Sequence, residues 1–143
     1  MLTKKTKYAL RALIVLVKAK DQKPMLISQI AATGNLPKRF LEGILLEMKR
    51  KQLLGSKMGL GGGYYLLQPP SEIMVSSVVR ILEGPIALLP CVSINFYQRC
   101  EECQNERTCS IREMMEKVRE ATLKIMGNTS IEDLALREKE LSL

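Results

Sequence analysis

The chain has 143 residues, of which 46% are hydrophobic and 26% are charged, and its formal net charge is +7. This length and apolar content fit one domain, or one domain with an extension, and are enough for a core. The sequence has no histidine, no pair of acids in a plausible pocket and no phosphate-binding loop, so an enzyme is not expected.

The N-terminal sequence lacks the features of a signal peptide. Its apolar run contains Arg11, no small-residue cleavage site follows it, and no run in the chain is long enough to span a bilayer. We therefore expect a cytoplasmic protein with no membrane association, in which thiols are kept reduced.

Positive charge is concentrated in the first half of the chain. Residues 1–70 carry a net charge of +10 and residues 71–143 a net charge of −3. A basic half joined to an acidic half suggests a polyanion-binding module attached to something else, although a solvated basic surface is the simpler reading.

The first half of the chain predicts a helix-turn-helix. A helix is expected from Lys4 to about Lys20 with Thr3 as its N-cap, a short second one over 27–32, and a third from Pro37 to about Gln52. The turn at 33–35 offers Gly34 as a left-handed C-cap. In this motif the first residues of the second helix face the base edges of DNA. In this chain those residues are Lys38 and Arg39. An ordinary charged helix surface is the alternative.

Two β-prone runs, 53–58 and 64–67, flank a glycine-rich turn and read as a hairpin. A hairpin that directly follows a helix-turn-helix is the wing of a winged helix. A nucleotide-binding loop would need a helix after the glycines, whereas Pro69 and Pro70 follow the second run. The glycines allow close approach of a backbone, and a phosphate backbone is one candidate.

All four cysteines lie in one short segment that follows a predicted helix over 76–83. They are Cys91, Cys100, Cys103 and Cys109, separated by eight, two and five residues. Thiolates without histidine select iron–sulfur clusters, zinc or copper(I). Clustered cysteines in a reducing compartment indicate metal or redox chemistry, and structural bystanders remain the third reading.

A long helix is predicted after the cysteines, from a capping box at Ser110 and Glu113 to about Met126. Its apolar stripe comprises Ile111, Met115, Val118, Thr122 and Ile125, with Met114 and Ala121 beside it. The stripe either packs on its own domain or, as we favour, is buried against a partner chain by two-fold symmetry. A short final helix starts within 129–134.

Several linked motifs resemble the Rrf-two family of bacterial winged-helix transcription regulators over nearly the whole chain. The resemblance is carried by the segments 7–13, 27–31, 36–42, 59–64 and 82–85, followed by the cysteines. It implies a homodimer on a palindromic operator, with the third helix in the major groove and the wing alongside. It also implies a [2Fe–2S] or [4Fe–4S] cluster in the loop before the dimer helix.

Two features depart from the family pattern. The wing usually carries an arginine before its first glycine, where this chain has Met58, which puts the minor-groove contact in doubt. The family commonly uses three cysteines and a variable fourth ligand, whereas this chain has four. Either all four bind the cluster, or one of Cys100 and Cys103 is spare.

Together these observations predict a mainly α-helical protein with a winged helix-turn-helix at 1–84, a cysteine-rich sensor loop at 85–110, and a dimerisation helix and tail at 111–143. Its function would be DNA-binding regulation controlled by an iron–sulfur cluster or by thiol state, with zinc or no metal left open. A small iron–sulfur electron carrier or cluster-delivery protein is the alternative. The metal ligands would be the four cysteines. The expected DNA contacts are Lys4, Lys5, Lys7, Arg11, Ser28, Lys38, Arg39, Lys57, Gly61, Gly62 and Tyr64.

Overall fold

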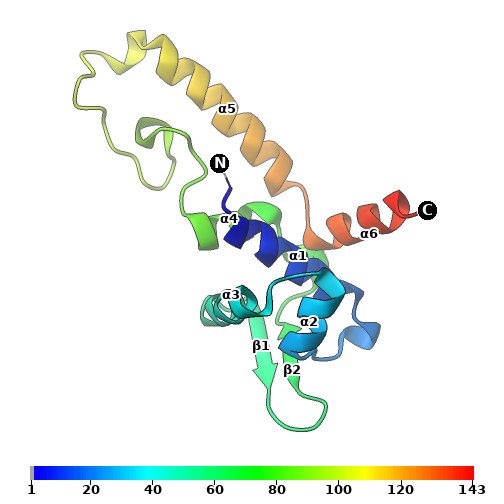
Figure 1. The fold of residues 1–143 in the computed structure, drawn as a ribbon. Helices are drawn as coiled ribbons and strands as arrows, with labels where there is room; N and C mark the ends of the chain where they lie inside the picture. Colours follow the sequence, from blue (N-terminus) through cyan, green and yellow to red (C-terminus); the bar gives the residue numbers. More distant parts are fainter. Residues whose placement is uncertain (1) are drawn as a thin grey trace.

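The computed structural model describes residues 2–143, within which six α-helices and one two-stranded antiparallel sheet are formed (Figure 1). In chain order the elements are α1 (Lys4–Lys18), α2 (Ile27–Gly34), α3 (Lys38–Arg50), β1 (Leu54–Lys57), β2 (Gly63–Leu66), α4 (Val75–Glu83), α5 (Ser110–Gly127) and α6 (Ile131–Leu141). Four short 3-10 turns, η1 to η4, lie at Lys20–Gln22, Pro70–Glu72, Pro90–Val92 and Glu106–Thr108. The predicted mainly helical winged helix-turn-helix class is confirmed.

Helix α1 runs through the centre of the core. Thr3 caps its first turn as predicted, because the Thr3 side chain accepts a hydrogen bond from the Thr6 backbone N–H. Ala9, Ala12 and Leu13 are fully buried, and α1 packs against α2, α3, α4 and α6. The apolar side of α1 is therefore a contact surface for four other helices.

The last helix packs back onto this core. Ile131 at the start of α6 is fully buried, and its backbone N–H donates to the Ile73 carbonyl at 2.9 Å. Glu138 of α6 also forms an ion pair with Lys18 of α1. Residues 131–141 thus share the hydrophobic core of the N-terminal unit, although the predicted division groups them with the dimerisation helix.

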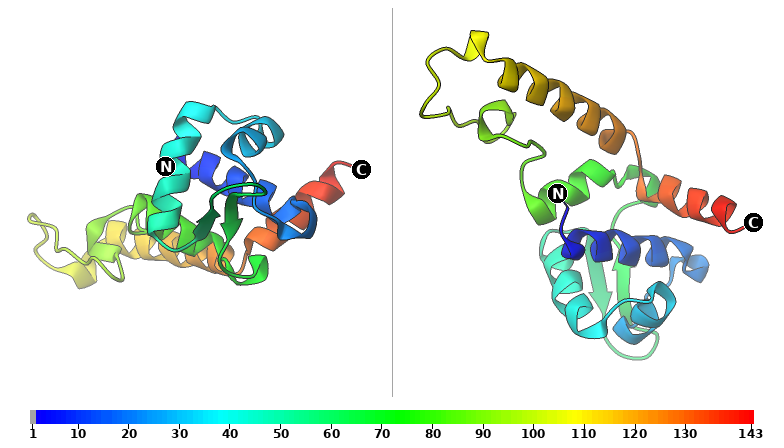
Figure 2. Two further views of the ribbon diagram at one scale, coloured as in Figure 1. Left: turned by 90° about the horizontal axis from the view of Figure 1, so that it is seen from below. Right: turned by 45° about the horizontal axis from the view of Figure 1, so that its top comes forward.

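The segment between α4 and α6 leaves the body of the protein. Figure 1 and the right view of Figure 2 show a long loop running outward from α4, and α5 returning along it to the core. The wing extends from the opposite end of the molecule. None of the helices within residues 2–143 combines the length and apolarity that a membrane span requires.

Candidate nucleic-acid interface and cysteine loop

The turn between α2 and α3 is built by Gly34, Asn35 and Leu36. The left-handed residue is Asn35, with φ 50° and ψ 52°, so the prediction of Gly34 in this role is wrong. Gly34 is instead the last helical residue, and a Cβ there would lie 3.0 Å from Leu36 Cδ1 and 3.2 Å from Val15 Cγ2. A side chain at Gly34 would force Leu36 or Val15 to shift by a few tenths of an ångström, because the turn packs tightly on α1. Asparagine at the next position tolerates the left-handed backbone.

The first turn of α3 faces solvent. Lys38 and Arg39 are exposed, and Ser28 near the start of α2 is exposed as well. Phe40, the next residue along α3, is 65% exposed. A basic pair with an adjacent apolar ring suits a DNA groove, because lysine and arginine bind phosphates and guanine while apolar groups contact the thymine methyl.

Gly43 lies one turn further along the same exposed face of α3. A Cβ at this position would meet no atom within 4 Å, so the fold itself does not require glycine there. A glycine inside a helix costs about 1 kcal/mol relative to alanine. The missing side chain leaves the outer surface of α3 free for close approach by another molecule, a feature that sequence reasoning missed.

The wing is a tight hairpin attached to the start of α2. Lys57 pairs with Gly63 at its end, and Lys57 and Gly61 are exposed. Tyr64 exchanges both backbone hydrogen bonds with Met25, at 2.8 and 2.9 Å, and its side chain is partly buried. The Tyr64 backbone therefore fixes the wing to the helix-turn-helix, and Gly62 lies buried within the turn.

The four predicted cations of α1 do not form a single surface. Lys5 forms an ion pair with Glu47 of α3 at 3.1 Å. Arg11 donates from Nε to the Gly34 carbonyl at 2.9 Å, at the end of α2. Lys4 and Lys7 line an open groove with Arg11 and with Leu134 of α6. The positive charge of α1 is thus divided between the side that faces α2 and α3 and the side that faces α6.

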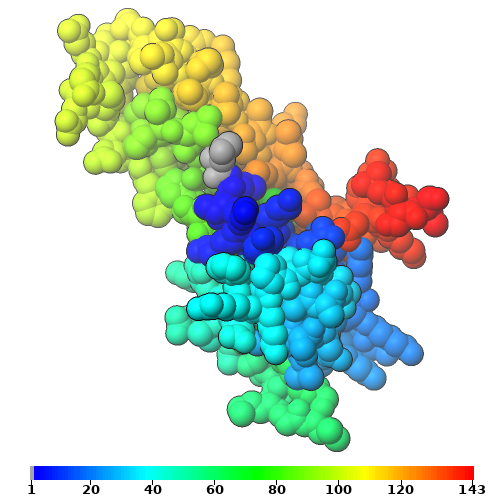
Figure 3. All heavy atoms as spheres, viewed as in Figure 1, coloured from blue at the N-terminus to red at the C-terminus, as the bar shows by residue number. Residues whose placement is uncertain are grey.

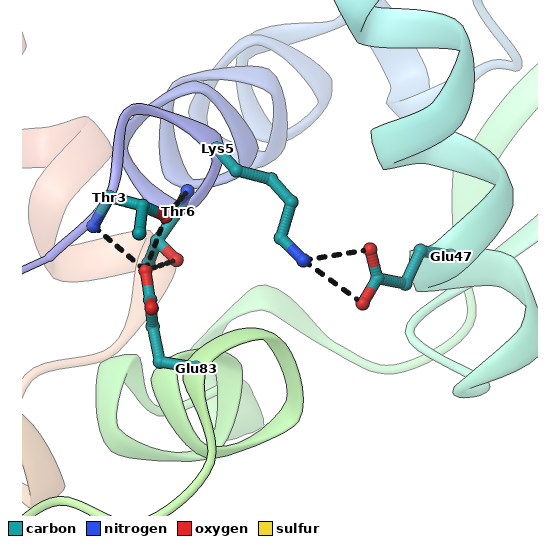
Figure 4. Close-up of polar contacts among 5 residues, drawn as sticks. All are labelled: Thr3, Lys5, Thr6, Glu47 and Glu83. Atoms are coloured by element: carbon teal, nitrogen blue, oxygen red, sulfur yellow. Dashed lines mark hydrogen bonds and ion pairs between the residues drawn. The ribbon is translucent and has the colours of Figure 1, made fainter.

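Glu83, the last residue of α4, binds the start of α1 (Figure 4). Its Oε1 accepts hydrogen bonds from the Thr3 backbone N–H at 2.8 Å and from the Thr3 and Thr6 hydroxyls, each at 2.5 Å. These bonds, first those from the Thr3 and Thr6 hydroxyls, lower the pKa of Glu83 from 4.5 to about 2. The carboxylate therefore joins α4 to α1 within one turn of the Lys5–Glu47 pair.

The four cysteines occupy different environments in the loop. Cys91 is buried in η3, Cys100 is exposed, and Cys103 and Cys109 are partly exposed; all four are free thiols. The Cys100 thiol donates to Glu102 Oε2 at 3.2 Å, and this hydrogen bond raises the pKa of Cys100.

Cys109 is the N-cap of α5. Its Sγ accepts a hydrogen bond from the Arg112 backbone N–H at 3.4 Å, and the helix begins at Ser110. The predicted capping box with Ser110 as its cap is therefore wrong by one residue. A predicted metal ligand thus satisfies a free backbone donor at the start of α5, so a change at this sulfur acts directly on the helix end.

Side-chain hydrogen bonds of Tyr97, Arg99 and Arg119 help to hold the loop. The Tyr97 hydroxyl donates to Glu106 across the cysteine segment, and this bond raises the pKa of Tyr97. Arg99 donates to the Cys103 carbonyl at 3.1 Å. Arg119 of α5 donates to the Val92 carbonyl at 2.5 Å, next to Cys91. The first arm of the loop is therefore attached to α5.

Helix α5 buries none of its residues. The exposed apolar positions are Ile111, Met114, Val118, Ala121 and Ile125, whereas Met115 and Thr122 turn toward the side that is partly covered. The exposed row follows spacings of three and four, which is the pattern of a helix that pairs with another helix. The stripe predicted from the sequence thus mixes two faces of α5.

The donor set of the loop fits a soft-metal site, because four thiols within one segment are the ligands that iron–sulfur clusters and zinc prefer. Within residues 2–143, however, no three cysteine, aspartate or glutamate side chains are gathered in an arrangement that could hold a metal ion. Cys91 is buried while Cys100 faces solvent, so binding a cluster would require the loop to refold around it.

Comparison with known proteins agrees with the fold and the order of the motifs. A sequence model of the Rrf2 family, described as an iron-dependent transcriptional regulator, matches residues 2–137. An HTH-type transcriptional regulator named rrf2-like from Rhodobacter capsulatus is 40% identical over 137 residues, covering 94% of this chain and 91% of that protein. The HTH-type transcriptional regulator CymR of Bacillus subtilis is 30% identical over 131 residues, covering 92% of this chain and 86% of CymR.

Two solved structures share the whole arrangement of elements. The structure of CymR, the global cysteine regulator of B. subtilis, has a TM-score of 0.79 at 28% identity and covers 96% of this chain and 97% of that one. The structure of IscR from T. potens has a TM-score of 0.78 at 20% identity and covers 100% of this chain and 91% of that one. It shows the same fold. The relatives found by sequence are transcriptional regulators rather than enzymes. The chain therefore belongs to the Rrf2 family of winged-helix, DNA-binding transcriptional regulators.

Proposed function

We propose that this protein is a cytoplasmic homodimer that binds a palindromic DNA operator, and that the state of its cysteine loop controls operator affinity. In this proposal the first turn of each α3 reads the major groove and the wing lies alongside. Two half-sites are then separated by about 34 Å, one turn of DNA, so a small change in the spacing of the two α3 helices alters affinity.

The observation that carries the proposal is the Glu83 contact at the entrance of the loop. Glu83 is followed by Gly84, where the chain departs toward the cysteines with φ 92°. Any movement of this departure point acts on Glu83, whose carboxylate holds Thr3 and Thr6 of α1. One turn away, Lys5 holds Glu47 of α3. The loop is thereby linked to the recognition helix through charge-assisted hydrogen bonds.

The other end of the loop leads into α5, whose exposed apolar row we assign to the dimer contact. Two copies of the row could cover each other by two-fold symmetry. Arg119 ties this helix to Val92, and Cys109 caps its first turn. A change in the loop would therefore act on both the dimer helix and the recognition helix, as coupling between two sites requires.

We assign the sensing role to Cys91, Cys100, Cys103 and Cys109, as ligands of an iron–sulfur cluster or as redox-active thiols. A bound cluster would supply metal–thiolate bonds that cross-link the loop, and a disulfide would restrain it in a similar way. Support comes from the donor set and from the family description as iron-dependent. An electron carrier without DNA binding would leave the exposed turn at Lys38 unexplained.

Replacing Glu83 with alanine is expected to uncouple the loop from DNA binding. Allosteric coupling of this kind typically changes affinity about 5- to 150-fold between two states. For the wild-type protein we expect a ratio of this size between the operator affinity of the oxygen-free form and that of the form obtained by oxidation and chelation. In Glu83→Ala the ratio should fall toward one. Operator affinity measured by fluorescence anisotropy in both states tests this expectation.

The control is Glu72→Ala, which removes an exposed carboxylate from η2. This substitution should leave the ratio of operator affinities between the two forms as it is in the wild type. Acid unfolding reports on the contact itself: because the folded-state pKa of Glu83 is about 2, its contribution to stability is present above pH 4.5 and is lost as pH falls toward 2. The stability gap between wild type and Glu83→Ala should shrink over that range. An unchanged affinity ratio in Glu83→Ala would contradict the proposed route.

A further inference from the structure

The tip of the wing exposes two large apolar side chains. Met58 is 94% exposed and Leu60 is 105% exposed, and among the large apolar residues that the structure describes only Leu143 is comparable. Apart from these two, every residue between Lys57 and Tyr64 is glycine, so Met58 and Leu60 supply all the side-chain chemistry of the tip. Such exposure is unfavourable in water, and two neighbouring cases on one projecting element point to an interaction site.

The turn that presents them is structurally defined. The Gly62 N–H donates to the Gly59 carbonyl at 3.0 Å, and Gly59 and Gly61 adopt φ values of 89° and 72°. A Cβ on Gly62 would lie 2.3 Å from the Lys57 carbonyl oxygen, and one on Gly63 would lie 2.2 Å from that of Met25. These glycines allow the chain to turn tightly, which leaves Met58 and Leu60 on the outside.

The wing tip is also the part of the helix-turn-helix unit that extends furthest from the core. Figure 1 and the space-filling view in Figure 3 show the hairpin projecting beyond α2 and α3. The Met25–Tyr64 bridge fixes it to the segment that leads into α2. If α3 lies in the major groove, as proposed above, the wing would lie over the neighbouring part of the duplex. The basic residue Lys57 directly precedes the tip.

We propose that Met58 and Leu60 enter the minor groove beside the α3 site and pack against deoxyribose and base edges at a deformable step. This inference rests on operator binding by the proposed dimer. Methionine and leucine cannot bind phosphates, but they are among the apolar wedges that proteins insert between base pairs from the minor groove. Pyrimidine–purine steps yield most easily to such wedges, so the operator should carry one at the wing position. The wing thus contributes an apolar contact where charge is usual in the family.

The test uses a duplex that the wild-type protein selects from a randomised library, with affinities measured over a range of salt concentrations. Met58→Ser combined with Leu60→Ser should weaken binding about tenfold or more without changing the salt dependence, because neither side chain neutralises a phosphate. Lys57→Ser should instead reduce the slope of log K against log salt by about 0.9 for each phosphate that Lys57 neutralises in the wild type. Leu143→Ser removes an equally exposed leucine and should change neither the affinity nor its salt dependence.

Modified duplexes identify the groove. Replacing adenine with 2,6-diaminopurine at the positions flanking the α3 site adds an amino group to the minor groove and keeps the major-groove pattern. This change should weaken DNA binding by the wild-type protein and leave DNA binding by the double serine variant unaffected. Wild-type affinity in the double variant, or equal sensitivity of both proteins to diaminopurine, would overturn the proposal. If the wild-type protein selects no duplex, operator binding itself is contradicted, and this inference fails with it.

Discussion

Replacing Lys38 and Arg39 together with alanine is expected to lower operator affinity by at least about 100-fold. Both residues are exposed in the first turn of α3, where a helix-turn-helix reads base edges. A good contact to a base is worth about 1–3 kcal/mol, and a dimer on a palindrome would be deprived of each such contact in both half-sites. Stability should be nearly unchanged, since neither side chain belongs to the core. Anisotropy titrations with the selected duplex, together with thermal unfolding, measure both effects.

The matched control lies at the other end of the same helix. Lys49 and Arg50 are also an exposed basic pair, so Lys49→Ala combined with Arg50→Ala removes the same charge from α3. We expect this control to weaken binding less than tenfold, through a weaker general attraction to the phosphates. Equal losses of affinity in the two double variants would mean that α3 does not read DNA through its N-terminal turn.

Replacing Val118 with glutamate is expected to raise the dimer dissociation constant by about 100-fold or more. Val118 lies in the middle of the exposed row on α5, so two-fold pairing of these helices would place both carboxylates in an apolar contact. An unpaired charge buried in this way costs about 3–5 kcal/mol, and about 1.4 kcal/mol corresponds to a factor of ten. Sedimentation velocity over a dilution series measures the change, and affinity for a palindromic operator should fall with it.

Lys117→Gln serves as the control for this substitution. It changes the net charge by the same amount on the neighbouring residue, which is largely exposed and pairs only with Glu113 on the helix surface. Such surface ion pairs are worth at most about 1 kcal/mol, so the dimer should persist. If the Val118→Glu protein remained dimeric down to the same concentration as the wild-type protein, the dimer contact would lie elsewhere.

The elements of the DNA-binding unit were predictable because their signals are local. The apolar spacing of α1 and α3, the turn at 33–35 and the glycines of the wing each depend on nearby residues, and all are confirmed within a few positions. The errors arose where neighbours in space decide. Gly34 is selected by contact with Leu36 and Val15, not by its backbone angle. Phe40 follows the apolar spacing of α3 but lies just beyond the edge of its buried face.

The site beyond the helix-turn-helix was less accessible from sequence. Glu83 lies 77 residues from Thr6, and no local sequence pattern predicts a hydrogen bond across that separation. The stripe predicted on α5 rests on apolar character alone, so it combines partly covered residues with the exposed row. Sulfur is an uncommon N-cap, so the sequence indicates a ligand at Cys109 and not a helix cap. The Glu83 contact and the division of α5 into two faces depend on long-range packing, which spacing does not encode.

The most direct test of the central claim is one preparation measured in two ways. The protein is purified without oxygen, its iron, sulfide and zinc are determined per chain, and its affinity for the selected operator is measured before and after oxidation and chelation. We predict iron with matching sulfide, and a change in affinity of about fivefold or more that is abolished in the variant Cys100→Ser with Cys103→Ser. An affinity that is the same in every state of the four cysteines would contradict control by the loop.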